Sequence, residues 1–287
     1  MIGIEFASGK KAALPSSWDE MTPEQVRRVF RIHSRCVRER RSPLEFNIRV
    51  LAMLLDAKLW RLGRLSGDSA AAENVYMLCD RCLGFLFAGG NCAALSFDSV
   101  KNPLPRVFAR GRRLSGPADL LQDLSFGEFR HALNSFQAFF SSGSENDLDE
   151  AVAFLYRRRS ASENPAGRKV RSLSQSGFAT DVQLAAALRP WEKNLIMLWF
   201  SACIQYIQTG RLTIDGETVD MSLLFNGSDG GGPAFGWSDL LVEIAKDRSL
   251  GTVDQVDERP LFTVLGIMWH NYKENKRYEQ NVKNRKA

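Results

Sequence analysis

The sequence lacks the long apolar run that a membrane-spanning helix needs. Its longest apolar stretch, Leu195–Ile204, covers ten residues and is interrupted by Ser201, whereas a bilayer requires roughly 20. The first residues also lack the basic and then apolar pattern of a secretory signal peptide. We therefore expect a cytoplasmic protein that has no membrane segment.

Sequence motifs typical of catalytic or cofactor-binding sites are scarce. The chain has only three histidines, which lie far apart in the sequence, and it has no serine in the pattern of a nucleophile elbow. The glycine run at Gly230–Gly232 lacks the Lys-Ser/Thr pair of a phosphate-binding loop. We therefore expect the chain not to be an enzyme, and we predict no catalytic residue and no cofactor.

The five cysteines lack the spacing of a small disulfide-bonded scaffold, and their odd number favours free thiols in a reducing cytoplasm. His33, Cys36, Cys79 and Cys82 do form two pairs with the short spacing of zinc ligands. Both pairs lie in segments with a strong helical period, where a buried free thiol is the commoner state of cysteine. The sequence therefore predicts no metal site.

Helix signals are abundant. Capping boxes, in which a Ser or Thr hydroxyl and a Glu or Gln three residues later bond each other's backbone N–H, occur at Thr22–Gln25, Ser42–Glu45 and Ser125–Glu128. Apolar residues then recur at steps of three and four, which places them on one helical face. The predicted buried faces are Val26, Val29, Phe30, His33 and Val37 after the first box, Leu44, Ile48, Leu51, Leu54 and Leu55 after the second, and Phe126, Phe129, Leu133, Phe136 and Phe140 after the third.

Hairpin signals accompany the helices. Short alternating segments flank turn residues near Ser8-Gly9, at Arg110-Gly111 and at Asp215-Gly216. The fold class predicted from these signals is mainly α with short β-hairpins. The last helix is expected to run from Pro260 to about Arg277.

A degenerate internal repeat of hairpin plus helices is one interpretation of this order. The pattern Phe-Ala-x-Gly-basic-basic occurs at Phe6 and again 102 residues later at Phe108, and the helices beginning at Thr22, Ser125 and Trp237 would be equivalent. The alternative is that caps and hairpins recur in any helical protein. The predicted modules are residues 1–100, residues 101–210 with a mobile loop at 157–177, and a shorter module 211–287 packed on the second.

Basic residues are the best candidates for a binding site. Arginines at helical spacing form a basic stripe beside the first apolar face, and a second basic group begins the predicted loop 157–177. Such groups can bind an anionic partner, although a solvated helix face is the plainer interpretation. The candidate residues are Arg27, Arg31, Arg35, Arg38, Arg157, Arg158 and Arg159.

Several sequence segments resemble those of a known group of proteins. Residues Leu14–Gln25 resemble the opening of uncharacterised prophage proteins encoded in tail gene clusters, and Asn102–Pro105, Leu114–Asp119, Trp191–Asn194 and Leu198–Phe200 are similar to later blocks. The resemblance implies a non-catalytic protein of phage tail assembly, such as a tail assembly chaperone. It implies a tape-measure or tube protein as partner, and a location in the bacterial cytoplasm or in the virion. The competing hypothesis is a nucleic-acid-binding protein that uses the Arg27–Arg41 basic stripe.

Overall fold

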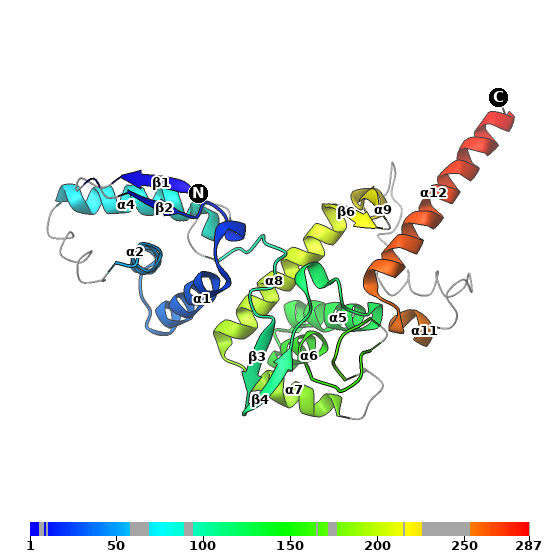
Figure 1. Cartoon of the computed structure of the whole chain (residues 1–287), viewed down its shortest axis with the longest axis horizontal. Helices are drawn as coiled ribbons and strands as arrows, with labels where there is room; N and C mark the ends of the chain where they lie inside the picture. The colour runs from blue at the N-terminus through cyan, green and yellow to red at the C-terminus, as the bar shows by residue number, and fades with distance from the viewer. Residues whose placement is uncertain are drawn as a thin grey trace. The chain divides into compact units, whose positions relative to one another are not determined.

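The computed structural model describes residues 1–5, 9, 11–57, 69–88, 94–164, 166–171, 177–214, 216–225 and 253–286. The chain is mainly helical and carries three small antiparallel sheets (Figure 1), which confirms the predicted fold class. It divides into two compact units, unit 1 with residues 1–104 and 189–202, and unit 2 with residues 105–188 and 203–287. The predicted modules follow a different division and stay a prediction, as does the repeat.

Unit 1 combines a hairpin with a helical layer. Strands β1 (Ile2–Glu5) and β2 (Lys11–Leu14) pair in antiparallel register, with Ile2 opposite Leu14. Helix α1 packs on α2, and α2 packs on α4. The other elements of unit 1 are the 3-10 turns η1 (Trp18–Glu20) and η2 (Gly84–Leu86), the helices α1 (Pro23–Arg38), α2 (Pro43–Leu54) and α4 (Ser69–Leu83), and the first part of α8 (Pro190–Thr209).

The core of unit 1 is aromatic. The indole of Trp18 is buried, with ring centroids 5.9 Å from Phe30, 5.7 Å from Phe85 and 4.9 Å from Phe97. Because Trp18 stands just before α1 and Phe30 lies within it, this contact holds the helix to the chain that leads into it. Such tilted and edge-on rings stabilise a core beyond the area that they bury.

Two of the three predicted capping boxes form completely. Thr22 and Ser125 each accept from the backbone N–H three residues later, at 3.2 Å in both cases, and each receives the reciprocal side-chain bond. The third forms by half: Ser42 Oγ accepts from the backbone N–H of Glu45 at 3.2 Å, but the Glu45 carboxylate accepts from Arg49 instead. An arginine one turn further along the helix outcompetes the backbone for that carboxylate.

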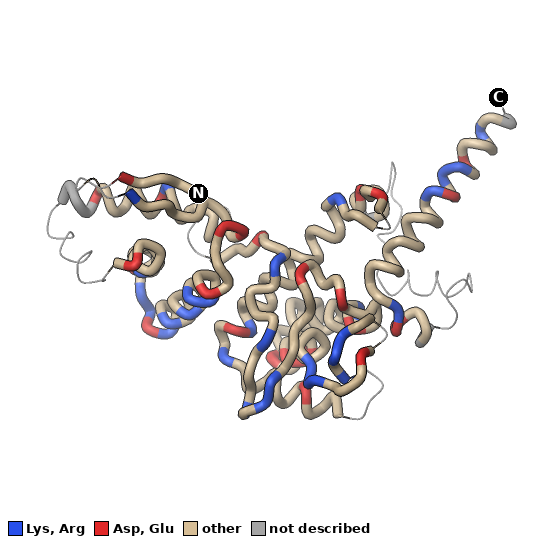
Figure 2. The backbone as a smooth tube through the Cα atoms, in the orientation of Figure 1, with Lys and Arg blue, Asp and Glu red and all other residues tan. Residues whose placement is uncertain are grey.

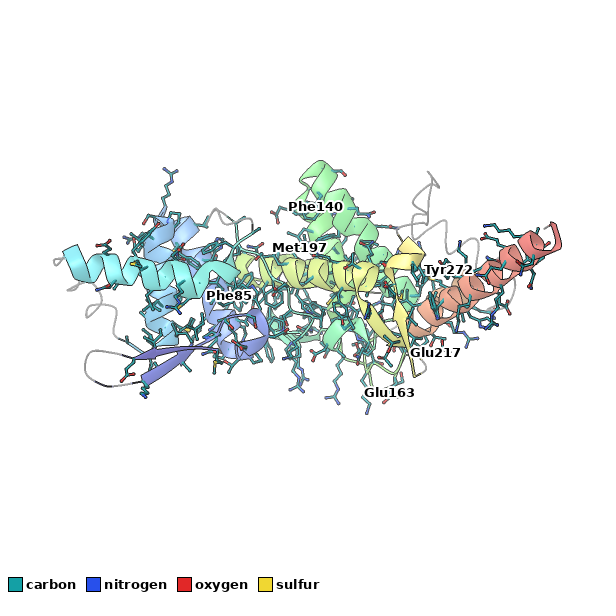
Figure 3. All side chains as sticks on the ribbon, turned by 90° about the horizontal axis from the view of Figure 1, so that it is seen from above. Phe85, Phe140, Glu163, Met197, Glu217 and Tyr272 are labelled. Atoms are coloured by element: carbon teal, nitrogen blue, oxygen red, sulfur yellow. The ribbon has the colours of Figure 1, made fainter. Side chains whose placement is uncertain are left out.

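The predicted buried faces are correct in their middle and wrong at three helix ends. Val37 in the last turn of α1 is 64% exposed, Leu44 in the first turn of α2 is 44% exposed, and Phe140 near the end of α5 is 69% exposed (Figure 3). Between the ends, Val29, Leu51 and Phe129 are fully buried, whereas His33 and Ile48 are half-buried. Helix periodicity fixes a face but not the length over which a neighbour covers it.

Unit 2 begins with a three-stranded sheet and a helical layer. Strand β4 (Arg112–Ser115) pairs with β3 (Arg106–Ala109) and with the short β5 (Arg157–Arg158). The turn between β3 and β4 has Arg110 at φ +47° and Gly111 at φ +73°, the left-handed pair that a two-residue hairpin requires. Three helices complete this part: α5 (Phe126–Ser142), α6 (Glu145–Leu155) and α7 (Phe178–Ala186).

The second hairpin of unit 2 packs against the last helix. Its strands β6 (Arg211–Ile214) and β7 (Glu217–Asp220) pair in register, and Glu217 lies 2.6 Å from Lys273 of α12 (Figure 3 labels Glu217). Helix α12 (Leu261–Lys286) is anchored where Leu261 donates to the Leu124 carbonyl at 2.9 Å. It extends beyond the predicted end, and most of its residues after Lys273 are exposed (Figure 1). The remaining elements are η3 (Asp119–Leu121), α9 (Ser222–Phe225) and α11 (Val253–Glu258).

The predicted loop 157–177 is held by the rest of unit 2 where the structure describes it. Arg157, Arg168 and Val170 are buried. The backbone N–H of Ser160 donates to the Lys169 carbonyl, and that of Arg171 donates to the Arg158 carbonyl, so the two sides of the loop continue the β5 pairing. The mobility of this stretch stays a prediction, but the stretch contributes to the core of unit 2, because Arg157 and Arg168 are buried beside carboxylates. Residues 165 and 172–176 lie outside the described residues, as do the predicted glycine loop and the predicted helix at Trp237.

Within the described ranges, none of the helices combines the length and the apolar character that crossing a bilayer demands.

Candidate functional site

Positive charge is concentrated on one helical hairpin of unit 1. Residues 22–57 contain eight arginines and four carboxylates, a net charge of +4, while the whole chain has a net charge of +5. The other 251 residues are therefore almost neutral, with 30 basic and 29 acidic side chains. Figure 2 shows the basic residues along α1 and the turn that leads into α2. We call residues 22–57 the arginine hairpin.

The first half of the arginine hairpin is organised by Glu24. Its carboxylate lies 2.8 Å from Arg27, 3.3 Å from Arg28 and 3.6 Å from Arg31. Desolvation alone would raise the pKa of Glu24, but the hydrogen bond from Arg27 and the nearby guanidinium charges lower it. Arg31 also lies 4.8 Å above the ring of Trp191, a cation–π contact that fixes its guanidinium.

The second half is organised by two further carboxylates. Arg35 and Arg41 lie 2.7 and 3.3 Å from Glu39, and Arg41 and Arg49 lie 3.5 and 2.6 Å from Glu45. The hydrogen bond from Arg35 lowers the pKa of Glu39, and the one from Arg49 lowers that of Glu45. These carboxylates stay ionised at neutral pH and offset part of the positive charge.

Arg38 and Arg40 differ from the other arginines of the hairpin. Both are exposed, and within the described part of the chain their side chains make no hydrogen bond or ion pair. The backbone around them is rigid, because Arg40 N–H bonds the Val37 carbonyl at 3.1 Å and Arg41 N–H bonds that of Cys36 at 2.8 Å. This pair of bonds is the Schellman ending of a helix. The turn therefore presents two guanidinium groups to solvent on a fixed frame.

The Schellman position at Arg40 is unusual for its residue type. Arg40 has φ +52°, in the left-handed region where glycine is the common residue and any other L-residue is strained by roughly 1–2 kcal/mol. Asp56, which ends α2, has the same conformation at φ +49°, so both ends of the arginine hairpin carry this strain.

The second predicted basic group is not a surface site. Arg157 is 1% exposed, and its guanidinium lies 3.9 Å from both Glu128 and Asp181. Arg158 pairs with Asp181 as well. Of the predicted residues here, only Arg159 is exposed, so grouping Arg157 and Arg158 with an anion-binding loop is corrected.

These arginines and their partners form a charge-balanced network that is buried except at Asp123, whose side chain is 35% exposed. Arg168 lies 3.4 Å from Glu128 and 3.7 Å from Asp123, and it donates to the backbone carbonyls of Ser115 and Leu155 at 3.1 and 2.9 Å. Three arginines (Arg157, Arg158 and Arg168) thus face three carboxylates (Asp123, Glu128 and Asp181). A network with no excess charge has no reason to recruit an anion. Its effect is to fasten residues 157–171 to α5 and the sheet.

The three cysteines that have the spacing of zinc ligands are buried free thiols, and His33 is half-buried. Burial raises the pKa of the Cys79 thiol to about 11 and also raises the pKa values of Cys36 and Cys82. His33 packs edge-on to Phe46 at 5.6 Å, and burial lowers its pKa. Protonated thiols are poor metal ligands and poor nucleophiles. Among the residues that the structure describes, no group of three or more His, Cys, Asp or Glu side chains could hold a metal ion.

The arginine hairpin is thus the surface on which the sequence-based candidates Arg27, Arg31, Arg35 and Arg38 come together, whereas Arg157 and Arg158 lie in the interior of unit 2. Arg40 belongs to the predicted Arg27–Arg41 basic stripe, but its left-handed backbone at φ +52° was not evident from the sequence. No family model, no curated protein and no solved structure matches the chain.

Proposed function

We propose that this chain is a non-catalytic interaction protein that binds an acidic protein through the arginine hairpin of unit 1. The observation that carries the proposal is the concentration of +4 of the chain's +5 net charge in residues 22–57. Complementary charge speeds encounter and suppresses wrong partners. Arg38 and Arg40, whose side chains are exposed and unpaired within the described residues, are the groups best placed to meet partner carboxylates.

A protein partner fits this surface better than nucleic acid does. Three carboxylates are interleaved with the arginines, namely Glu24, Glu39 and Glu45, and their ion pairs leave few uncompensated guanidinium groups for a run of phosphates. Apolar Val37 and Leu44 stand exposed on either side of the turn. Nucleic-acid affinity comes mainly from many phosphate contacts, whereas protein interfaces combine apolar anchors with a few charged groups.

The cellular role rests on the resemblance to prophage proteins encoded in tail gene clusters. We propose that the chain assists phage tail assembly in the bacterial cytoplasm, as a tail assembly chaperone or as a component of the virion. The partner in that role is the tape-measure protein or the tube protein. A protein that binds and releases an assembling partner gains from electrostatic attraction, because such attraction raises the association rate without requiring tight binding.

Co-expression tests this function directly. The full chain is produced with a tape-measure or tube protein encoded in the same genome, and co-purification is measured. We expect a complex that weakens at least tenfold on the double change Arg38→Glu and Arg40→Glu. The matched control is Arg159→Glu, which alters an exposed arginine of unit 2.

Two outcomes would contradict the proposed function. One is that neither the tape-measure protein nor the tube protein co-purifies with the chain. The other is tight, salt-dependent binding of a 30-base-pair duplex DNA that is lost on changing Arg27, Arg31, Arg35 and Arg38 to Glu, which would favour the nucleic-acid hypothesis.

A further inference from the structure

A pocket with a volume of about 330 Å³ lies between α1 and α2 in unit 1. This volume is at the lower end of the roughly 300–1,000 Å³ that ligand pockets enclose, so the pocket fits a side chain or a small molecule rather than a whole helix. Its charged lining residues are Arg28, Arg35 and Arg49, and among the described residues no carboxylate lines it. The lining therefore favours an anionic ligand.

The interior of the pocket is apolar, and its positive charge lies at the mouth. Of the apolar lining residues, Ala52 is buried, and Ile32 and Met53 are half-buried. By contrast, the side chains of Arg28 and Arg35 are 56% and 62% exposed. A ligand can therefore place an apolar group inside, out of contact with water, while its charged groups stay beside the arginines.

The arginines at the mouth retain donors for a ligand. Arg28 Nε donates to the Glu24 carboxylate at 3.3 Å, and Arg35 Nε donates to the Glu39 carboxylate at 2.7 Å. Within the described residues, the Nη atoms of these two arginines make no hydrogen bond. A guanidinium has several N–H donors, and a pair of them binds a carboxylate in parallel. Each of the two arginines can therefore bind a further carboxylate.

The spacing of the lining residues on α1 sets the spacing of the ligand. Arg28, Ile32 and Arg35 follow one another at steps of four and three, so they form a row along one side of the helix. Seven residues of α-helix rise about 10 Å. The row presents charge, apolar surface and charge over that length. A complementary ligand has a large apolar group between two carboxylates.

Positive charge is in excess around the mouth of the pocket. Six arginines of the arginine hairpin share the three carboxylates of Glu24, Glu39 and Glu45. A phosphate backbone would contact the arginines and leave the apolar interior empty. Protein interfaces combine an apolar anchor in a pocket with charged groups around it. The pocket therefore favours a segment of an acidic protein over a nucleic acid.

We propose that the pocket between α1 and α2 binds an acidic segment of the partner protein, which inserts one large apolar side chain and places one carboxylate on Arg28 and another on Arg35. This inference rests on the proposed function and specifies the part of the partner that is recognised. The apolar side chain contacts Ile32 and Met53 and supplies affinity. The two ion pairs set the position of the segment along α1, because their carboxylates must lie about 10 Å apart.

A synthetic peptide tests the pocket. The probe is a fluorescein-labelled 16-residue peptide, rich in alanine and otherwise uncharged, with glutamates at i and i+7 and a phenylalanine at i+4. Its anisotropy is measured with the full chain, and we expect saturable binding. Binding should weaken at least tenfold when the phenylalanine is replaced by serine, because the anchor is lost. It should weaken as much when the two glutamates are adjacent, because the peptide then has the same charge at the wrong spacing.

Two double variants with the same loss of charge test the arginines. We expect Arg28→Gln with Arg35→Gln to bind the peptide at least tenfold more weakly than the unchanged chain. The matched control is Arg27→Gln with Arg41→Gln. Arg27 and Arg41 lie 2.8 Å from Glu24 and 3.3 Å from Glu39, the same carboxylates, but they do not line the pocket. The control should therefore bind the peptide within a fewfold of the unchanged chain.

A third variant tests the apolar interior. Ala57 belongs to the lining and is half-buried, so Ala57→Leu adds apolar volume to the pocket and leaves every charge in place. We expect this variant to bind the peptide at least tenfold more weakly. The melting temperature of each variant is measured as well, so that a loss of binding is assigned to the pocket only where the fold is retained.

Three outcomes would overturn the proposal. One is the absence of peptide binding at millimolar concentration. Another is an equal loss of binding in the two double variants, which would assign the attraction to overall charge. The third is a dimer of the chain that dissociates in the variant with Arg28→Gln and Arg35→Gln, since the pocket would then bind a second copy.

Failure of the pocket can be told apart from failure of the proposed function. If the tail protein co-purifies equally with the variant that carries Arg28→Gln and Arg35→Gln, the pocket is wrong while the interaction role stands. If the peptide binds in the pocket but neither tail protein co-purifies with the chain, the tail role is wrong while the pocket stands.

Discussion

The guanidinium of Arg168 lies 3.4 Å from the carboxylate of Glu128, and both side chains are almost completely buried. Glu128 has a second role: its carboxylate accepts from the backbone N–H of Ser125 at 3.1 Å and so completes the capping box of α5. The carboxylate of Glu128 thus joins the start of α5 to the loop that carries Arg168. This arrangement links the local folding of α5 to the placement of residues 157–171.

Removing Arg168 should destabilise unit 2 strongly. Arg168→Ala leaves Glu128 buried with less compensation, and breaking a buried pair in this way costs about 3–5 kcal/mol. The free energy of unfolding measured in urea should fall by that amount. The control Arg159→Ala changes an exposed side chain and should stay within about 0.5 kcal/mol of the unchanged chain. Equal effects of the two substitutions would show that the network contributes little.

Limited proteolysis should report the same network. The bonds after Arg157 and Arg168 are shielded, because both side chains are buried. We expect native protein to resist trypsin at these two positions and Arg168→Ala protein to be cut between residues 157 and 171. Rapid cleavage of the unchanged chain after Arg157 would contradict the burial.

These contacts also explain what sequence can and cannot predict here. Thr22 and Ser125 were identifiable as caps because the bonds join residues three apart. The burial of Arg168 was not, because its partner Glu128 is 40 residues away, and a run of arginines looks the same whether or not carboxylates enclose it. The exposure of Leu44 was missed for a related reason: periodicity identifies a face, while the extent of its cover depends on other helices.

Thiol reactivity should follow burial. Cys36, Cys79, Cys82 and Cys203 are buried, and burial raises the pKa of each thiol, that of Cys79 to about 11. The fifth cysteine, Cys92, lies outside the described residues and is therefore replaced in a Cys92→Ser variant. In this variant the native chain should react with a disulfide reagent at pH 8 far more slowly than the urea-unfolded chain. Two or more thiols that react rapidly in the native state would contradict this packing.

The acidic residues of the arginine hairpin should give a distinct pH dependence. The pKa of Glu39 is lowered below its ordinary value of 4.5 by the hydrogen bond from Arg35. A lowered folded pKa means that the stabilisation is present above about pH 4.5 and is lost as the pH falls through the folded value. The melting temperature of Glu39→Gln should therefore lie below that of the unchanged chain at pH 7, and the difference should shrink as the pH falls below 4.5 and the carboxylate is protonated. A difference that is independent of pH across this range would assign the effect to something other than this charge.

Replacing Arg40 with glycine should separate stability from binding. Arg40 occupies a left-handed position that strains an L-residue by roughly 1–2 kcal/mol, while glycine costs about 0.4–1 kcal/mol through the entropy of the unfolded chain. Loss of a positive charge at the end of α1 removes a further 0.3–1 kcal/mol, approximately. These terms nearly cancel, so the melting temperature of Arg40→Gly should stay close to that of the unchanged chain.

Binding should respond differently, because Arg40→Gly removes one of the two exposed guanidinium groups of the arginine hairpin that make no ion pair within the described residues. We expect the acidic partner protein to bind severalfold more weakly. Asp56 offers a matched control: it has φ +49° and ends α2 with the same pair of backbone bonds, from Asp56 to Met53 and from Ala57 to Ala52. Asp56→Gly relieves the same strain without removing a positive charge, so it should keep or raise the melting temperature and leave binding of the partner protein intact. If Arg40→Gly binds the partner protein as Asp56→Gly does, the strained arginine has no role in recognition, and its left-handed backbone is only the way in which α1 ends.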